Sequence, residues 1–131
     1  MAQDQDCIAA VIDAFYEAIS GPSGQDCDWG SIAALFASGA SILSHRGGAA
    51  GALSVDEYVE RLRSSLTDRD FYERGLDYRI EIHGDIAQVR SRYEASFEPE
   101  FSEIRKMGTN LIQLVRDEGV WMIASMVYQD D

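Results

Sequence analysis

Two histidines carry the side chains best suited to exchange protons near neutral pH, so they are the first candidates for acid–base chemistry. His45 follows a short apolar segment that is predicted to be a strand, and it could serve as a base if that strand borders a cavity. Neighbouring side chains on a strand point to opposite faces, so only one of Ser44 and His45 is expected to enter such a cavity. We keep His45 as a catalytic candidate and favour a position at the rim or on the surface. His83 precedes a Gly-Asp turn signal and is predicted to be a solvated hairpin residue.

Other patterns that carry chemistry are missing from the sequence. The two histidines lie far apart and have no adjacent pair of carboxylates, so no metal-ligand spacing is present. Ser44 beside His45 is adjacency in sequence, which does not produce the geometry of a catalytic triad. The glycine-rich run 47–51 lacks the Lys-Ser/Thr of a phosphate-binding loop and is predicted to be a pocket rim or lid. We therefore expect no bound metal and no cofactor.

The composition indicates one globular domain over residues 1–131, with 46% hydrophobic and 26% charged residues. Eleven basic and 23 acidic residues give a net charge of −12, which disfavours binding to nucleic acid and to membrane surfaces. The two cysteines are too few for a disulfide scaffold, and the N-terminal residues lack the features of a signal peptide. No apolar stretch approaches the ~20 residues that cross a bilayer. The expected location is the cytoplasm.

Amphipathic helices are the elements that must carry one wall of any cavity. Apolar residues recur at helical spacing from Ile8 to Ile19, and the run 21–24 ends this first helix. Ser54 and Glu57 form a capping box, the clearest helix start in the chain. These two segments are predicted to pack their apolar stripes on a common core.

A shorter helix and a short strand are predicted between those two helices. The helix is expected to begin at Asp28, with Trp29 and Phe36 on its inner side and Gly39 just past its end. The strand is expected over 40–45, which would bring it directly before the glycine-rich run.

Beyond about Gly75 the period changes to two, because apolar residues from Leu76 onward alternate with polar ones. The run 84–85 is a two-residue turn signal, and the hairpin register that it fixes agrees with the apolar pattern. The predicted cross-strand pairs are Ile82 with Ala87, Ile80 with Val89, and Asp77 with Arg92.

A last hairpin is predicted over 104–128, turning at 117–119, and both of its faces are largely apolar. A chain this small can bury one face against its own helices, so burial of the second face requires a partner subunit. We predict a homodimer through this C-terminal sheet. Strict alternation groups Thr109, Leu111, Gln113, Trp121, Ile123 and Ser125 on one face, and Ile112, Leu114, Met126 and Tyr128 on the other. Thr109, Gln113 and Ser125 could orient a ligand if the first face is the inner one.

The order helix, helix, short strand, helix and two long hairpins is similar to that of the nuclear-transport-factor-2-like superfamily, including its SnoaL-like and ketosteroid isomerase-like branches. Residues 15–19, 34–41, 83–87 and 119–123 carry the resemblance. It implies an α+β fold in which N-terminal helices pack on a strongly curved, mostly antiparallel sheet, forming a cone with an internal apolar pocket. Such a pocket suits a small hydrophobic ligand. The family holds isomerases, dehydratases and cyclases beside many members without a known reaction, so fold does not settle function.

The isomerase branch requires a carboxylate base and two oxyanion donors, and the matching positions do not carry them. The resemblance places Ser44 at the base, and serine has no usable basicity at neutral pH. The donor tyrosine aligns with Phe15, although an offset of one residue would bring in Tyr16. The second donor falls near Leu111. Steroid isomerase activity is therefore not expected.

Two functions stay open. The first is a ligand-binding domain, a homodimer with one apolar pocket per subunit and no demonstrated chemistry. The second is an acid–base enzyme, an isomerase, dehydratase or cyclase acting on a small hydrophobic or polycyclic compound, which requires a perturbed histidine or carboxylate inside the cavity. Dehydratase chemistry would draw on Tyr58, Tyr78 and Tyr93, for which ordinary core positions are favoured. A protein-interaction module is supported only by the doubly apolar hairpin. The expected pocket residues are Phe15, Tyr16, Trp29, Phe36, Ser44, Tyr58, Tyr93, Leu111, Gln113 and Trp121.

Overall fold

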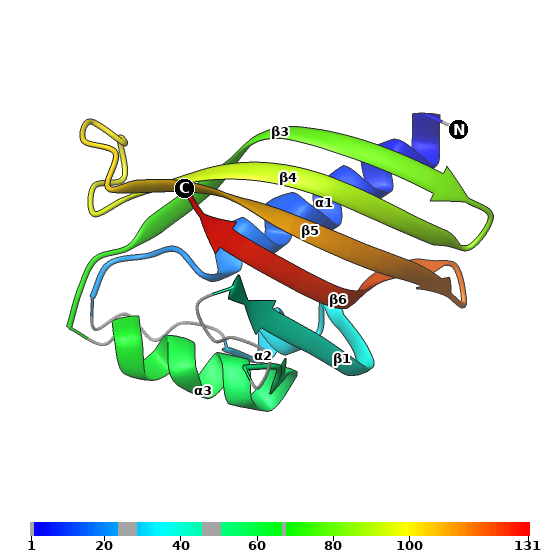
Figure 1. The fold of residues 1–131 in the computed structure, drawn as a ribbon, viewed down its shortest axis with the longest axis horizontal. Helices are drawn as coiled ribbons and strands as arrows, with labels where there is room; N and C mark the ends of the chain where they lie inside the picture. The colour runs from blue at the N-terminus through cyan, green and yellow to red at the C-terminus, as the bar shows by residue number, and fades with distance from the viewer. Residues whose placement is uncertain (1, 24–28, 46–50, 67) are drawn as a thin grey trace.

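A strongly curved sheet wraps around one long helix in the computed structural model of the chain (Figure 1). The structure describes residues 2–23, 29–45, 51–66 and 68–131. The predicted α+β class, with N-terminal helices on a mostly antiparallel sheet, is confirmed. None of the described helices is both long and apolar enough to cross a membrane. The elements in chain order are α1 (Ala2–Ala18), α2 (Trp29–Ala33), β1 (Phe36–Ser44), β2 (Leu53–Ser54), α3 (Val55–Leu66), β3 (Tyr72–His83), β4 (Ile86–Ser96), β5 (Lys106–Asp117) and β6 (Val120–Asp130).

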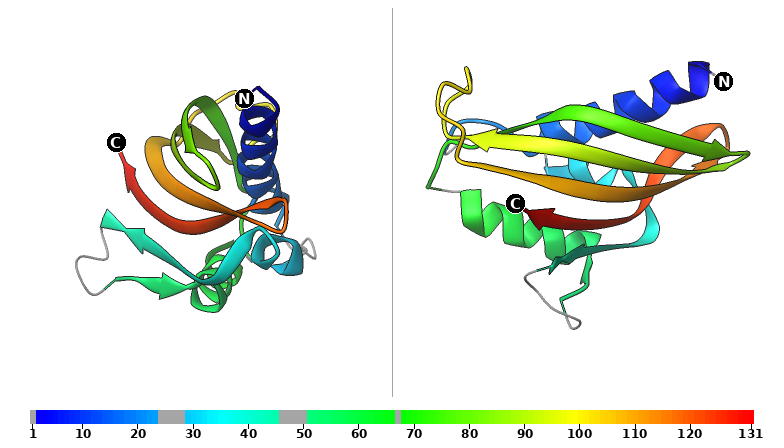
Figure 2. Two further views of the ribbon diagram at one scale, coloured as in Figure 1. Left: turned by 90° about the vertical axis from the view of Figure 1, so that its right-hand side faces the viewer. Right: turned by 45° about the horizontal axis from the view of Figure 1, so that its top comes forward.

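The six strands lie in the order β2-β1-β6-β5-β4-β3. Strand β1 runs parallel to β6, and every other neighbouring pair is antiparallel. The end-on view in Figure 2 shows the sheet curling around α1, while α2 and α3 lie beside β1. The helices therefore cover the concave face of the sheet and leave its convex face to solvent in the single chain.

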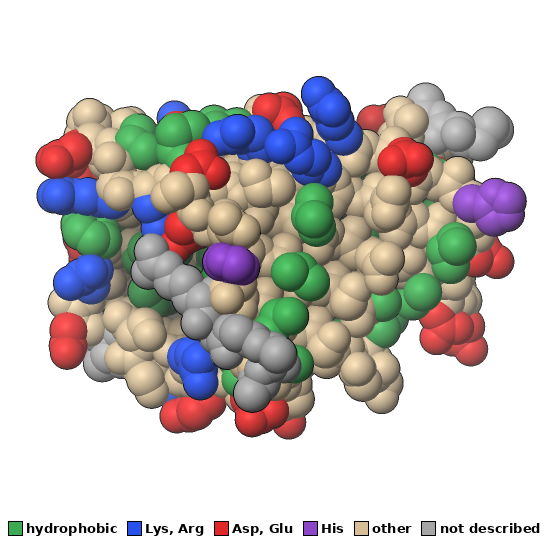
Figure 3. All heavy atoms as spheres, viewed as in Figure 1, with side chains coloured by type: hydrophobic (Ala, Val, Ile, Leu, Met, Phe, Trp, Pro, Cys, Tyr) green, Lys and Arg blue, Asp and Glu red, His purple; other side chains and the backbone are tan. Residues whose placement is uncertain are grey.

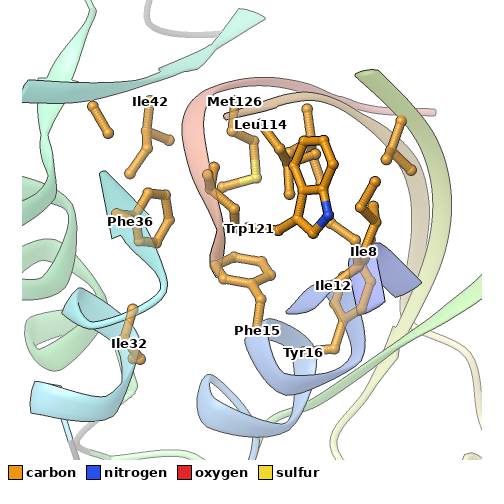
Figure 4. Packing of buried hydrophobic residues seen from close by; sticks show 14 of the residues in the cluster. Ile8, Ile12, Phe15, Tyr16, Ile32, Phe36, Ile42, Leu114, Trp121 and Met126 are labelled. Atoms are coloured by element: carbon orange, nitrogen blue, oxygen red, sulfur yellow. The ribbon is translucent and has the colours of Figure 1, made fainter. Parts of the chain in front are cut away.

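The apolar stripe of α1 is confirmed as the centre of the core. On this helix Ile8 and Ile12 are fully inaccessible and Phe15 is buried, while Val11 is partly buried. Ile19, just past the end of the helix, is buried as well. Figure 4 shows the Phe15 ring directed between Trp121 of the sheet and Phe36 of β1. The Phe15 ring also meets the Phe36 ring edge-on at 6.1 Å between centroids. Helix α1 is thus fixed along the sheet by the apolar contacts that its periodicity predicts.

The capping box at the start of α3 is confirmed. The backbone N–H of Ser54 donates to Glu57 Oε1 at 3.0 Å, and the N–H of Glu57 donates to Ser54 Oγ at 3.2 Å. Two backbone donors without an intrahelical partner are satisfied in this way. Helix α3 consequently begins at Val55 and directs Tyr58 into the core.

The predicted length of the second helix is wrong, because Phe36 begins β1 rather than ending a helix. Helix α2 stops at Ala33. The N–H of Ile123 donates to the Leu35 carbonyl at 2.9 Å, so from Leu35 onward the backbone pairs with β6 instead of continuing the helix. Gly39 lies inside β1 with a φ of 77°, where the register against β6 is irregular. Gly39 therefore permits a bulge in a strand instead of capping a helix.

The hairpin of β3 and β4 has the predicted register and one unpredicted irregularity. Gly84 adopts a φ of 57° in the turn, a conformation that glycine tolerates. The register shifts between Gly75 and Asp77, so Leu76 lies outside with 43% exposure although the alternation placed it inside. The confirmed pairs are Ile82 with Ala87, Ile80 with Val89, and Asp77 with Arg92.

A second irregularity rearranges the faces of the β5–β6 hairpin. Gln113 pairs with Ser125 whereas Leu114 pairs with Ile123, so β6 contains one extra residue at this point. Because side chains alternate, an extra residue moves everything beyond it to the opposite face. Trp121 and Ile123 are consequently buried on the concave face beside Leu114, and the grouping predicted by strict alternation is wrong.

Candidate functional site

A hydrogen-bonded polar group lies inside the otherwise apolar core. Tyr16 Oη lies 2.6 Å from Ser91 Oγ, and Asn110 Nδ2 donates to the same hydroxyl at 2.9 Å. All three side chains are buried. Burial raises the pKa of the Tyr16 phenol to about 12, so it stays protonated at neutral pH. The hydroxyl and amide positions are thereby fixed between α1 and the sheet.

Glu73 is a titratable group that the fold places in a partly buried position at the start of β3. It pairs with the buried Ala95 on the concave side of the sheet, where β3 begins. Its backbone N–H donates to Ser20 Oγ at 2.9 Å, and the same hydroxyl donates to the Tyr16 carbonyl at 2.7 Å. The end of α1 therefore holds the Glu73 backbone, and its side chain is partly buried next to the helix.

The environment of Glu73 favours its protonated form. Loss of water on burial raises the pKa of its carboxyl group to about 7, with Asp130 adding to the rise and Lys106 opposing it. Within the part of the chain that the structure describes, this carboxylate makes no hydrogen bond and no ion pair. Lys106 is instead 3.6 Å from Asp130 Oδ1, which also accepts a 2.6 Å hydrogen bond from Tyr93 Oη.

Aromatic side chains surround this carboxylate. The charge of Glu73 contributes to a raised pKa of Tyr16, Tyr58 and Tyr93, although burial is the largest cause for each. Tyr58 stacks on Phe15 at 6.4 Å between ring centroids, and Phe15 meets Tyr16 edge-on at 5.6 Å. Helices α1 and α3 and strand β4 thus supply rings to one region.

An opening between α1 and β3 reaches this region. The opening, called the Glu73 cleft below, has a volume of about 290 Å³. Gly75 forms part of its wall, and a side chain there would collide with the ring of Tyr78. The volume is at the small end of the range for ligand pockets. The cleft is lined by Asp13, Tyr16, Glu17, Ser20, Tyr72, Glu73, Arg74, Gly75 and Phe101.

The residues predicted to line a pocket do not all lie together in the structure. Six of them belong to the buried core, where they could wall an internal site, and their role as pocket residues stays a prediction. Ser44 is partly buried at the end of β1, paired with Tyr128, and His45 is exposed. The side chain of Trp29 lies outside the described part of the structure, as does the run 47–50 of the predicted lid. The six core residues are Phe15, Tyr16, Phe36, Tyr58, Tyr93 and Trp121.

The predictions that Leu111 and Gln113 line an internal pocket are wrong. Both side chains are exposed on the convex face, and Leu111 is 53% accessible. They border a surface hollow of about 620 Å³ together with Ser125. The physical reason is the extra residue in β6, which separates them from Trp121. The residue before Leu111 is Asn110, which points inward and bonds to Tyr16. The polar pair inside the fold is therefore Tyr16 and Asn110, which are the sequence neighbours of Phe15 and Leu111 respectively.

Glu73 was not among the residues predicted to form the site. The alternating pattern begins only after Gly75, so the first residues of β3 carried no strand signal. The bulge at Gly75 also interrupts the period that would place Glu73 on the inner face. A partly buried glutamate is recognised only from its three-dimensional neighbours. Across residues 2–23, 29–45, 51–66 and 68–131, no three His, Cys, Asp or Glu side chains are grouped to hold a metal ion.

The sequence matches a known family. A family model described as a SnoaL-like domain matches residues 2–127. A comparison with curated proteins finds no match.

Solved structures with the same fold include several proteins of unknown function. A cystatin-like-fold protein of unknown function from Nostoc punctiforme superimposes with a TM-score of 0.82 at 16% identity, covering 100% of this chain and 93% of that one. The function-unknown protein Rv3472 from Mycobacterium tuberculosis gives 0.80 at 17% identity, covering 98% and 72%. An NTF-2-like protein of unknown function from Silicibacter pomeroyi gives 0.72 at 18% identity, covering 99% and 98%. At these identities the likeness establishes the fold alone.

Proposed function

Because the chain belongs to the SnoaL-like domain family, within the nuclear-transport-factor-2-like superfamily, we propose that it binds a small, mainly hydrophobic molecule in the Glu73 cleft. The observation that carries the proposal is the carboxylate of Glu73, which makes no ion pair or hydrogen bond within the described residues and borders an aromatic-lined opening. A partly buried charge without a partner costs stability. Proteins retain such groups where a ligand or a reaction uses them.

A side chain that fills the cleft is expected to abolish ligand binding. Glu17 is exposed on α1 and lines the cleft, so Glu17→Trp should occupy the opening without disturbing the core. The assay is NMR titration of the labelled protein with small aromatic alcohols, ketones and amines. Binding should shift the amide signals of residues 13–20 and 72–75 in the wild type and not in Glu17→Trp.

Glu60→Trp provides the matched control, because Glu60 is exposed on α3 and does not line the cleft. This variant should bind like the wild type. Shifts confined to the convex face, around Arg90 and Leu111, would place the binding site elsewhere and defeat the proposal.

An acid–base enzyme is the second candidate, favoured by the pKa of Glu73. A carboxylate with a pKa of about 7 is matched to proton transfer at neutral pH. It would take a proton from a carbon next to a carbonyl; the C–H electron pair would form the C=C bond of an enolate, and the π pair of the carbonyl would move onto its oxygen. Tyr16 lines the same cleft and stays protonated, so its hydroxyl can stabilise that oxygen. Isomerisation, dehydration and cyclisation of a small hydrophobic or polycyclic compound can each begin with such a step.

Hydrogen–deuterium exchange measures this chemistry without knowledge of the substrate. With 2-indanone in D₂O, the wild type should accelerate exchange at the carbons beside the carbonyl. The rate should rise through about pH 7 as Glu73 ionises and then level off. Glu73→Gln should lose the acceleration. Equal rates for the two proteins would remove the enzymatic candidate and leave the binding proposal intact.

We propose that two chains associate through the convex face of the C-terminal sheet. Leu111 on β5 and Val127 on β6 are 53% and 44% exposed there, and apolar strand residues of this size favour a partner. Figure 3 shows hydrophobic side chains on this face interspersed with basic and polar ones. A mixed surface of this kind is typical of an interface between folded subunits.

Leu111→Glu should convert the dimer to a monomer, because four carboxylate oxygens would be buried at the twofold contact without partners. Light scattering after gel filtration at micromolar concentration measures the mass. Ile104→Glu is the control, since Ile104 is 39% exposed in the β4–β5 connection and should leave the dimer intact. A wild-type protein that elutes as a monomer would contradict the interface.

We also propose a cytoplasmic location. Cys7 is exposed and carries a free thiol, which persists most readily in a reducing compartment.

A further inference from the structure

We infer that the molecule bound in the Glu73 cleft is a small organic cation, an amine with an apolar body, paired with Glu73 and enclosed by the neighbouring rings. This inference rests on the proposed function and names its ligand class. It follows from the charge of the cleft, its aromatic lining and the lack of an ion pair to Glu73 within the described residues.

The charge that the cleft presents is negative. Three carboxylates line it, those of Asp13, Glu17 and Glu73, against one basic side chain, Arg74. Arg74 is already engaged, since its Nη2 is 2.6 Å from Glu94 Oε1 and its Nε donates to the same oxygen at 2.8 Å. The net charge of −12 adds a long-range field of the same sign. An anionic ligand is therefore disfavoured and a cation is favoured.

The lining also supplies aromatic rings that attract a cation. Tyr16, Tyr72 and Phe101 border the cleft. One face of Phe101 already holds the Arg74 guanidinium at 4.0 Å from the ring centroid, which shows that this site accommodates such contacts. An ammonium group near an aromatic face gains about 0.5 to 2 kcal/mol, more when water is excluded. The apolar body of an amine would pack on the same rings.

Among the described residues Glu73 makes no ion pair or side-chain hydrogen bond, whereas Asp13 and Asp130 beside it do. Asp13 accepts a hydrogen bond from Tyr78 Oη, and Asp130 has both Lys106 and Tyr93. The volume of about 290 Å³ leaves room for a single-ring amine, whose ammonium group would form an ion pair with Glu73. The ionisable groups that line the cleft with Glu73 or act on its charge are Asp13, Tyr16 and Glu17 of α1, Tyr58 of α3, Tyr72 and Arg74 of β3, Tyr93 of β4, Lys106 of β5 and Asp130 of β6.

Binding of a cation must depend on pH in a defined direction. Only the ionised form of Glu73 attracts an ammonium, and the pKa of about 7 leaves roughly a tenth of the sites ionised at pH 6. At pH 8 about nine tenths are ionised, so the affinity should rise about fivefold over this range if the protonated form binds about tenfold more weakly. Benzylamine stays protonated over this pH range, so the change in affinity reports the ionisation of the protein and not that of the ligand.

Three probes of one shape test the ligand class: benzylamine, benzyl alcohol and benzoate. NMR titration of the labelled protein should give amide shifts at 13–20 and 72–75 with benzylamine, weaker shifts with benzyl alcohol and none with benzoate. Glu73→Gln should weaken benzylamine binding about tenfold and remove its pH dependence, while leaving benzyl alcohol unaffected. Glu60→Gln, which removes an exposed carboxylate of α3 outside the cleft, should bind all three probes as the wild type does.

The results that would contradict the cation can be told apart from those that would contradict the binding site. Benzyl alcohol or benzoate binding in the cleft as tightly as benzylamine would overturn the cation and leave the binding function standing. An unchanged benzylamine affinity in Glu73→Gln would likewise overturn it. No shift at the cleft with any probe would overturn both the cation and the proposed site.

Discussion

Glu73→Gln is expected to raise the free energy of unfolding by about 2 to 3 kcal/mol at pH 8 and to change it little at pH 4. The carboxyl group has a pKa of about 7 in the folded protein against a usual value of 4.5, so the folded state holds its proton longer than the unfolded state does. The stabilisation of the protonated form is complete below pH 4.5 and is lost as the pH rises through 7. Glutamine imitates the protonated form at every pH.

Urea denaturation at pH 4 and pH 8 measures this difference directly. Glu60→Gln is the control, because its exposed carboxylate on α3 should alter the free energy of unfolding by less than about 0.5 kcal/mol at either pH. A Glu73→Gln variant that is less stable than the wild type at pH 8 would show that the carboxylate has a partner that compensates its burial. The cation proposal would then lose its main support.

Phe15→Ala should lower the free energy of unfolding by about 3 to 5 kcal/mol. The Phe15 ring is 2% exposed and contacts the rings of Tyr16, Phe36 and Tyr58, which come from α1, β1 and α3. Its removal leaves a cavity at the junction of three elements, where the neighbours belong to separate segments and relax poorly. The loss is a large part of the stability of an ordinary domain.

Thermal and urea denaturation of Phe15→Ala and Phe15→Leu measure the effect, since leucine retains much of the volume and should cost considerably less. Leu76→Ala is the comparison outside the core: Leu76 is 43% exposed and should change the free energy of unfolding only slightly. A small effect of Phe15→Ala would mean that the junction collapses around the cavity.

Local sequence patterns predicted the elements that depend on local physics. The stripe of α1 and the capping box at Ser54 and Glu57 involve neighbours within four residues, and both are confirmed. The register of the β3–β4 hairpin was predictable because a two-residue turn fixes it. The pairs Ile82 with Ala87 and Ile80 with Val89 follow from that turn.

The errors in assigning strand faces have a common cause, which is an extra residue in a strand. A bulge carries no clear sequence signal, yet it reverses the faces of the residues beyond it. The bulge opposite Gln113 brought Trp121 inward and left Leu111 outside, so a pocket list built on strict alternation mixed two faces. The site around Glu73 was unpredictable for a related reason: its neighbours Ser20, Lys106 and Asp130 are distant in sequence.

The strand order also bears on whether the sheet can extend from one molecule to the next. An open sheet offers unpaired backbone groups at both edges, which can add strands from other molecules. One edge is β2, only the two residues Leu53–Ser54, which is too short to act as a template. The other is β3, where the register shift at Gly75 deforms the outer edge, and charged side chains follow one another along it. The exposed charges Arg74, Asp77, Arg79 and Glu81 should oppose edge-to-edge pairing, so we expect the irregularity that obscures Glu73 in the sequence to work against aggregation as well.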